Sequence, residues 1–168
     1  MPVSSQDFRA ALSRFASGVT IITARQDGEQ RGMTASAFVS VSLNPPLILV
    51  SVDKRAAMHA VLEAGQAFAV NILSQSQQLL SDHFAGRPDP GLRLPWSELG
   101  GLPVLDGAAA QLACTKYQTY DGGDHTLFVG EVQATRLTEK APLAYFGGTY
   151  RGLTDVLPPE VARMGVML

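Results

Sequence analysis

The sequence contains a single cysteine, Cys114, among 168 residues, so the chain cannot form an internal disulfide. This favours a reducing compartment, and we expect a cytoplasmic protein. Residues 1–15 lack the positive and then apolar order of a signal peptide, and no apolar run approaches membrane-spanning length. The formal net charge of −2 gives no electrostatic reason to expect nucleic acid or an anionic membrane as a partner.

Several catalytic signatures are also absent. No GxGxxG follows a predicted strand and no GxxxxGK[ST] occurs, so neither the dinucleotide-binding fold nor a P-loop is indicated. No GxSxG is present, which disfavours a serine hydrolase of that class. His59, His83 and His125 lie far apart without metal-ligand spacing, so we expect no metal site.

The length of 168 residues and a hydrophobic content of 46% suit one domain with a core of its own. Predicted strands come in runs with few helices, and no β-α-β alternation continues along the chain. This order favours a mainly β fold, an antiparallel barrel with peripheral helices, over a doubly wound sheet. We assign residues 1–153 to this domain and residues 154–168 to a C-terminal extension.

One stretch, residues 32–54, organises the rest of the chain. Apolar side chains alternate with mostly hydroxyl side chains over residues 33–42, which predicts one strand with a core face and a polar face. The Asn-Pro-Pro triplet at 44–46 predicts a turn, and the apolar run 47–52 is typical of a strand buried on both sides. The hydroxyls either face solvent, as is common in antiparallel sheets, or receive phosphate, ribose or carbonyl oxygens of a ligand.

Two helix starts and one long loop are also predicted. Residues 4–15 have helical apolar spacing with Ser4 as N-cap, and Ser74 with Gln77 fits a capping box. Residues 86–103 are dense in proline and glycine and contain the only tryptophan, Trp96, which predicts a lid or a connecting loop. Trp96 either stacks on a ligand or covers the core.

The segment 121–124, Asp-Gly-Gly-Asp, has the residues that a hairpin turn requires. His125 follows at the start of the outgoing strand, where it belongs either to the turn alone or to a cleft, donating to a carbonyl or carboxamide. Lys54 and Arg55, after the buried strand, either face solvent or hold a phosphate together with backbone N–H groups. Arg87 and Arg151 allow the same two interpretations.

Several segments, taken together and in order, resemble the short-chain flavin reductase family. The segments are FASGVTIITA (15–24), GMTASAF and SVSLNPPLILVSV (within 32–52), FAVNIL (68–73), FAG (84–86), GGDHTLFVGEV (122–132) and YFGGTYR (145–151). The resemblance spans residues 8–151. It implies an FMN-binding split β-barrel, a Greek-key-like antiparallel barrel, that forms a homodimer. FMN or FAD would bind near the subunit interface, with NADH or NADPH over the flavin ring.

The same resemblance implies cofactor contacts from several parts of the chain. These residues are Thr34, Ala35, Ser36, Ala37, Ser51, Val52, Asp53, Lys54, Arg55, Gly86, Arg87, Asp124, Tyr150 and Arg151. His125 is implied as the catalytic residue, beside the nicotinamide. Ala56, Ala57 and Met58 stand where family members often carry serine or threonine, so Lys54 or Arg55 would replace those phosphate contacts.

The function implied is that of an NAD(P)H:flavin oxidoreductase that hands reduced flavin to a partner monooxygenase. Hydride passes from nicotinamide C4 to flavin N5, and that step needs no general base. Two alternatives are a flavin-bound reductase of a ferric chelate or cobalt corrinoid, and a non-catalytic flavin carrier. The sequence does not decide whether the flavin is FMN or FAD, or whether the hydride donor is NADH or NADPH. Arg87, Arg93 and Arg151 are the candidate cations for the 2′-phosphate of NADPH.

Overall fold

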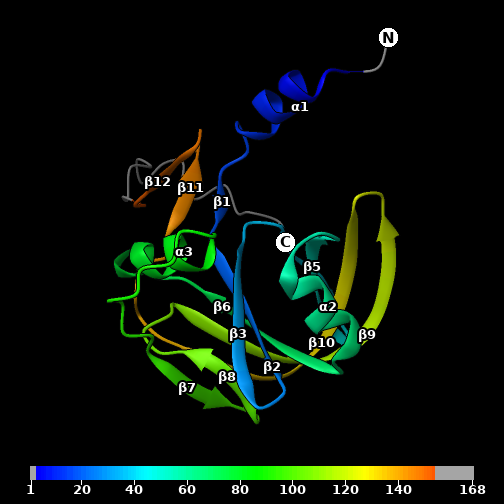
Figure 1. The fold of residues 1–168 in the computed structure, drawn as a ribbon, viewed down its shortest axis with the longest axis vertical. Helices are drawn as coiled ribbons and strands as arrows, with labels where there is room; N and C mark the ends of the chain where they lie inside the picture. The colour runs from blue at the N-terminus through cyan, green and yellow to red at the C-terminus, as the bar shows by residue number, and fades with distance from the viewer. Residues whose placement is uncertain (1–2, 154–168) are drawn as a thin grey trace, which may run out of the picture.

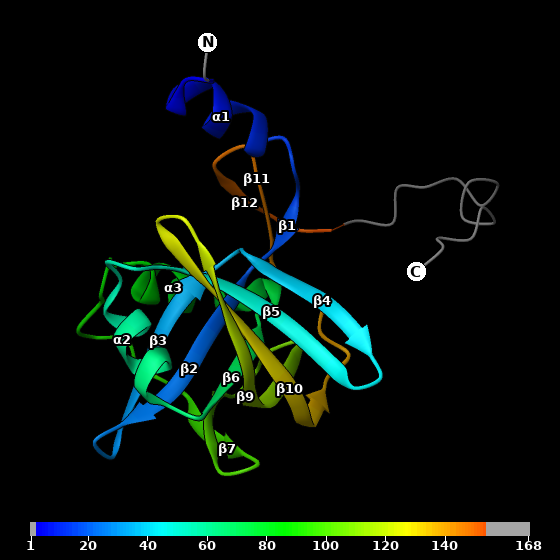
Figure 2. The same ribbon diagram turned by 90° about the vertical axis from the view of Figure 1, so that its right-hand side faces the viewer.

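Seven antiparallel strands form one strongly curved sheet in the computed structural model, which describes residues 3–153 (Figures 1 and 2). In spatial order they are β3 (Glu29–Ala35), β2 (Thr20–Gln26), β6 (Ala67–Ile72), β9 (Ala110–Gly122), β10 (His125–Leu137), β5 (Pro46–Asp53) and β4 (Phe38–Leu43). The mainly β, split-barrel fold is as predicted. The predicted extension, residues 154–168, lies outside the described residues.

The barrel closes where the chain passes from β3 to β4, which form opposite edges of the sheet. The Ser51 N–H donates to the Ala37 carbonyl at 3.1 Å, which extends the β4–β5 pairing into the segment between β3 and β4, called the seam below. The prediction of one continuous strand over residues 33–42 is therefore wrong: the chain leaves one edge at Ser36 and joins the other. As a result Val39 and Val41, expected on the core face, are both about half exposed at 55% and 51%.

The main core lies inside the barrel, under helix α2 (Ala57–Ala64). The α2 side chains Met58, Val61 and Leu62 pack in one buried cluster with the strand side chains Phe68 and Phe128. Burial of these apolar groups is the main stabilising contribution to the fold. Cys114 lies in this cluster, as expected for a small apolar side chain in mid-strand.

Strand β5 is buried on one face and half-buried on the other. Ile48, Val50 and Val52 point into the core, whereas Leu47 and Leu49 are only partly covered. The prediction of a strand buried on both sides was thus half right. The outer face of β5 keeps some contact with solvent because, among the described residues, no second layer covers it.

A second buried cluster lies under α3 (Gln78–Phe84), which follows a short 3₁₀ turn η1 (Gln75–Gln77). The Ser74–Gln77 capping box is confirmed: the Ser74 N–H donates to Gln77 Oε1 at 3.1 Å. Part of the predicted loop 86–103 instead belongs to a hairpin of β7 (Trp96–Leu99) and β8 (Leu102–Leu105). Trp96 packs edge-on against Phe84 with ring centroids 5.9 Å apart, so it covers the core.

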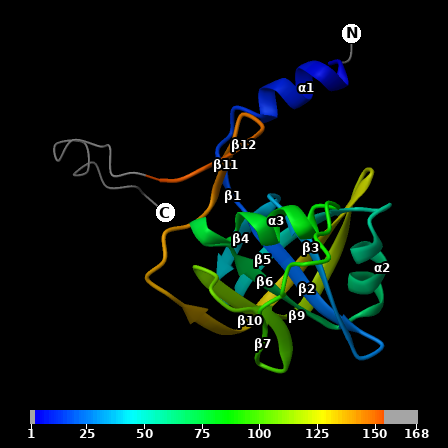
Figure 3. The same cartoon turned by 60° about the vertical axis from the view of Figure 1, so that its left-hand side comes forward.

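A small three-stranded sheet beside the barrel pairs a segment near the start of the chain with two strands near the end of the described residues (Figure 3). It consists of β1 (Ser17–Gly18), β11 (Ala144–Phe146) and β12 (Thr149–Arg151). Helix α1 (Ser5–Leu12) precedes it, extends beyond the barrel and has no buried residue. Ser4 caps α1 as predicted, accepting from the Asp7 N–H at 3.0 Å. None of the helices within residues 3–153 is both long and apolar enough to cross a bilayer.

Candidate functional site

Residues 34–37, at the end of β3 and the start of the seam, border a row of surface hollows. The first hollow, which we call the β3–α3 pocket, has a volume of about 580 Å³ and is lined by residues 34–36. The second, an apolar hollow of about 530 Å³, is lined by residues 36–39. Ser36, Tyr145 and Gly148 line both hollows, so the two are contiguous. A ligand longer than either hollow can therefore lie along this segment.

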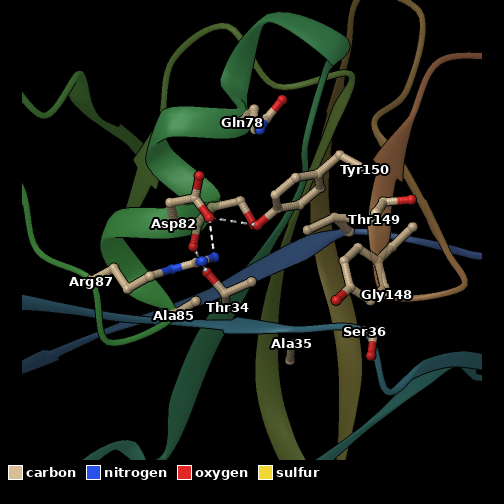
Figure 4. Close-up of a pocket in the computed structure, with 13 residues that line it drawn as sticks. Thr34, Ala35, Ser36, Gln78, Asp82, Ala85, Arg87, Gly148, Thr149 and Tyr150 are labelled. Atoms are coloured by element: carbon tan, nitrogen blue, oxygen red, sulfur yellow. Dashed lines mark hydrogen bonds and ion pairs between the residues drawn. The ribbon is translucent and has the colours of Figure 1, made fainter. Parts of the chain in front are cut away.

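The β3–α3 pocket lies between the end of β3, one face of α3 and the strand β12 (Figure 4). Tyr150 on β12 and Arg87 after α3 reach its mouth from two sides. The Thr34 hydroxyl donates to the Ser81 carbonyl at 2.7 Å, which ties β3 to α3. In the described part of the chain the neighbouring Ser36 hydroxyl makes no hydrogen bond, and it is exposed. Ser36 is thus the hydroxyl of this segment that a ligand can reach.

The polar wall of this pocket is a hydrogen-bonded group centred on Asp82. The Tyr150 hydroxyl donates to Asp82 Oδ1 at 3.1 Å and lies 2.9 Å from Ser81 Oγ. The Arg87 guanidinium forms an ion pair with the same Asp82 oxygen (Figure 4). Tyr145 packs edge-on against Tyr150, with ring centroids 5.4 Å apart. The pocket thus combines aromatic surface with a cation that is already paired.

A third hollow, the β10 groove, has a volume of about 540 Å³ and lies between α1 and the turn that joins β9 to β10. His125, the first residue of β10, lines this groove with Asp124. The half-buried Asp53 at the end of β5 and the exposed Arg55 two residues later line it as well. His125 is paired with Asp53 in the β10–β5 register. The sheet therefore brings the predicted histidine to the residues that follow the central strand.

Close ion pairs set the charge of the groove. The Arg55 guanidinium and N–H both donate to Asp53, with contacts of 2.7 to 3.1 Å. These hydrogen bonds hold the pKa of Asp53 well below its usual range. His125 Nδ1 lies 2.7 Å from Asp124 Oδ1, and this hydrogen bond lowers the pKa of Asp124. Both carboxylates therefore stay ionised at neutral pH.

The structure brings most of the predicted site residues to these hollows. Thr34, Ala35, Ser36, Arg87 and Tyr150 line the β3–α3 pocket, Ala37 lines the apolar hollow, and Ser51, Asp53, Arg55, Asp124 and His125 line the β10 groove.

Four predicted site residues line none of these hollows. The Val52 side chain is fully buried in the core. Gly86 and Arg151 are exposed, Gly86 with a left-handed φ of +86° beside Arg87. The Lys54 ammonium bonds to the β9–β10 turn, 2.5 Å from Asp121 Oδ1 and 2.7 Å from the Gly123 carbonyl.

Sequence reasoning missed the face of α3 that borders the β3–α3 pocket. Gln78, Ser81, Asp82 and Ala85 all line it. Their spacing of three, four and seven residues places them on one face of a helix, and that face is polar or small where the opposite positions are leucine. This spacing, next to the FAG segment, is the signal that could have found them.

The described residues contain few groups suited to acid–base or metal chemistry. Across residues 3–153, no three His, Cys, Asp or Glu side chains are grouped as metal ligands. The hollows instead offer a free hydroxyl, aromatic faces, backbone groups at the seam and one histidine. Such a site binds and orients reactants, and it suits a reaction whose electron transfer occurs between bound cofactors.

Comparison with known proteins shows similarity over most of the chain. Residues 12–154 match the family model of the flavin reductase like domain. The chain is 46% identical over 147 residues to the reductase component of 4-hydroxyphenylacetate 3-monooxygenase from Thermus thermophilus, which covers 87% of this chain and 95% of that relative.

Two solved structures are similar in fold as well as in sequence. Flavin reductase PheA2 in its native state has a TM-score of 0.88 at 46% identity, covering 91% of this chain and all of that one (100%). The NADH:FAD oxidoreductase SgcE6 of Streptomyces globisporus, in complex with NAD and FAD fragments, has a TM-score of 0.83 at 36% identity, covering 94% and 99% of the two chains.

Proposed function

This chain belongs to the flavin reductase family, and we propose that it is an NADH-dependent flavin reductase that supplies reduced flavin to a partner monooxygenase. The observation that carries the proposal is the convergence of three separate segments, residues 34–37, residues 51–55 and His125, on adjoining hollows. These are the segments that the resemblance implied as flavin and nicotinamide contacts. Relatives whose names describe NADH:FAD oxidoreductase and monooxygenase reductase activity support the same reaction.

The residues present fit a flavin nucleotide. The apolar hollow suits a flat hydrophobic ring system, and the hydroxyl of Ser36, which bonds to no residue within 3–153, is one of the groups that line it. We assign residues 34–37 to the ring, and Ser51 with the Asp53–Arg55 pair to the phosphate-bearing tail of FMN or FAD. Arg55 lines the groove but is paired with Asp53, so the Ser51 hydroxyl is the freer donor to the phosphate. When bound, the flavin supplies the hydride acceptor at its N5 atom.

His125 is the proposed catalytic residue, because it lines the β10 groove beside the seam. Its Nδ1 is engaged by Asp124, which leaves Nε2 to contact the nicotinamide nucleotide. In the neutral imidazole, whose Nδ1–H donates to the ionised Asp124, Nε2 would accept a hydrogen bond from the carboxamide N–H₂ group and orient the ring without taking part in electron transfer. The hydride transfer then needs no general base from the protein.

NADH rather than NADPH is the proposed donor. A 2′-phosphate needs a cation that is free to bind it, whereas a carboxylate suits the ribose 2′-hydroxyl. At the mouth of the β3–α3 pocket, Arg87 is already paired with Asp82. Asp82 therefore offers a carboxylate there, and the charge of Arg87 is already neutralised. This arrangement favours NADH, which lacks the 2′-phosphate.

A homodimer is the proposed assembly. Phe8, Leu12 and Phe15 in and after α1 are 53%, 56% and 78% exposed, and Val39 and Leu43 on β4 are exposed as well. A second copy of the chain that covers these side chains would remove this apolar surface from water. Sedimentation of the purified protein is expected to give twice the chain mass. We place the protein in the cytoplasm, where a single thiol stays reduced.

The test is NADH and NADPH oxidation with and without added FMN or FAD. We expect turnover that depends on added flavin and is faster with NADH. Flavin binding without turnover in any pairing would contradict the reductase function and leave a flavin carrier. Turnover that requires a ferric chelate or a cobalt corrinoid would indicate a different electron acceptor.

A further inference from the structure

Lys54, directly after β5, makes several contacts to the turn between β9 and β10. Its ammonium lies 2.5 Å from Asp121 Oδ1 and donates to the Gly123 carbonyl at 2.7 Å. Its backbone N–H donates to the Asp124 carbonyl at 3.0 Å. The residue that follows β5 therefore holds Asp121, near the end of β9, and both residues between β9 and β10.

That turn carries His125 into the β10 groove. Gly123 adopts a left-handed φ of +79°, so the turn depends on a backbone conformation that glycine permits. On the incoming side, Asp121 also accepts weakly from the Gly123 N–H at 3.4 Å. Beyond the turn, the β10 ladder to β5 begins at His125 itself. Without the Lys54 side chain, two glycines and an aspartate would precede His125 with few side-chain contacts to fix them.

The Lys54–Asp121 ion pair is expected to contribute little to the free energy of unfolding. Both side chains are substantially exposed, at 42% and 77%, and ion pairs of this kind add little to folding free energy. The pair nevertheless persists at neutral pH, since the hydrogen bond from Lys54 lowers the pKa of Asp121. We therefore expect the pair to affect the position of the turn more than the free energy of unfolding of the whole protein.

We propose that Lys54 is a positioning residue, whose ammonium fixes the β9–β10 turn so that His125 faces the nicotinamide nucleotide. This inference rests on the proposed function and assigns Lys54 a role distinct from phosphate binding. A phosphate-binding lysine affects the affinity for flavin, whereas a residue that acts through His125 affects the use of NADH. The two roles therefore give different kinetic results.

The test compares Lys54→Met with a matched variant, Arg25→Met. Arg25 also forms an exposed ion pair, with Glu98 at 3.5 Å, and neither residue lines the hollows. For Lys54→Met we expect kcat/KM for NADH to fall about tenfold or more, because small misplacements of a positioning group have large effects on rate. We expect an unchanged flavin Kd and a thermal midpoint that matches Arg25→Met. Lys54→Arg keeps a cation that can donate to both Asp121 and the Gly123 carbonyl, so it should retain most of the wild-type kcat/KM for NADH.

In Lys54→Met, a flavin Kd that rises about tenfold while kcat/KM for NADH stays unchanged would overturn the proposal. Hydrogen exchange of the amides of residues 122–126 provides a readout that does not depend on activity. We expect faster exchange there in Lys54→Met than in wild type or Arg25→Met, and equal exchange would also overturn the proposal. If the wild-type protein itself fails to oxidise NADH, the proposed function fails, and the exchange rates still decide whether Lys54 fixes the turn.

Discussion

Ser51 on β5 is hydrogen-bonded to Ala37 in the seam between β3 and β4, with the Ser51 N–H donating to the Ala37 carbonyl at 3.1 Å. Ala37 ends the segment that borders the β3–α3 pocket and the apolar hollow, and Ser51 begins the one that borders the β10 groove. This contact places the two proposed flavin-binding segments side by side. A single nucleotide can therefore contact both without any rearrangement of the sheet.

Ser36→Ala is expected to weaken flavin binding, because Ser36 carries the hydroxyl that a ligand can reach. Loss of one neutral hydrogen bond, about 0.5–1.5 kcal/mol, corresponds to a rise in the flavin Kd of roughly two- to tenfold. Ser40→Ala on β4 is the matched control, since Ser40 is exposed and lines no hollow. Quenching of flavin fluorescence measures both. Equal Kd values for the two variants would remove Ser36 from the site.

Thr34→Val tests the other hydroxyl of the segment, which bonds within the chain. It removes the donor to the carbonyl of the buried Ser81, so about 1–3 kcal/mol of unfolding free energy is expected to be lost. Urea denaturation of the variant and wild type gives this difference. A large change in flavin affinity with no change in stability would contradict the assignment.

Asp82→Asn is expected to increase the use of NADPH relative to NADH. The substitution neutralises the carboxylate that pairs with Arg87, and so frees the guanidinium for a 2′-phosphate. The ratio of kcat/KM for NADPH to that for NADH should rise about tenfold. Glu98→Gln removes the same charge outside the hollows and should leave the ratio unchanged. A ratio unchanged in Asp82→Asn would place the 2′ position elsewhere.

Gly130→Ala is expected to destabilise the core. A Cβ atom at residue 130 would lie 2.7 Å from Phe68 Cζ and 2.9 Å from Cys114 Cβ, both in the buried cluster. Overpacking of this kind costs about 1–3 kcal/mol of unfolding free energy. Gly18→Ala is the control, because a Cβ there meets no atom within 4 Å. Denaturation midpoints that fall equally in both variants would contradict this account of the packing.

Cys114 is expected to be unreactive in the folded protein. Burial raises the pKa of its thiol to about 12, so almost no thiolate exists at pH 8. A disulfide reagent should label no thiol in the native chain and one thiol per chain in guanidinium chloride. Rapid labelling of the native protein would show that the cluster around Cys114 opens readily.

The sequence predicts those parts of the molecule whose signals are local. The Asp-Gly-Gly-Asp turn and the following strand, His125–Leu137, form as expected because turn residues and strand patterning agree there. The Ser74 capping box also forms as predicted, because its two partners, Ser74 and Gln77, are only three residues apart in the sequence. The resemblance added the split-barrel family and a set of site residues, most of which line the hollows.

What the sequence could not predict depends on long-range contacts. The alternation over residues 33–42 does not show that the chain changes edge at Ser36, because the new partner of the chain, β5, comes later in the sequence. The pairing of Arg87 with Asp82, and of Lys54 with Asp121, likewise depends on the folded arrangement. Trp96 could not be placed because the core that it covers is assembled from distant segments.

The most direct test of the account is an anaerobic mixture of NADH with excess FMN or FAD and a catalytic amount of the protein. We predict that the visible absorbance of the flavin disappears as the nicotinamide absorbance falls, with one flavin reduced for each NADH consumed. His125→Ala should slow both changes equally. NADH and flavin that both stay unchanged in the presence of the wild-type protein would contradict the central claim.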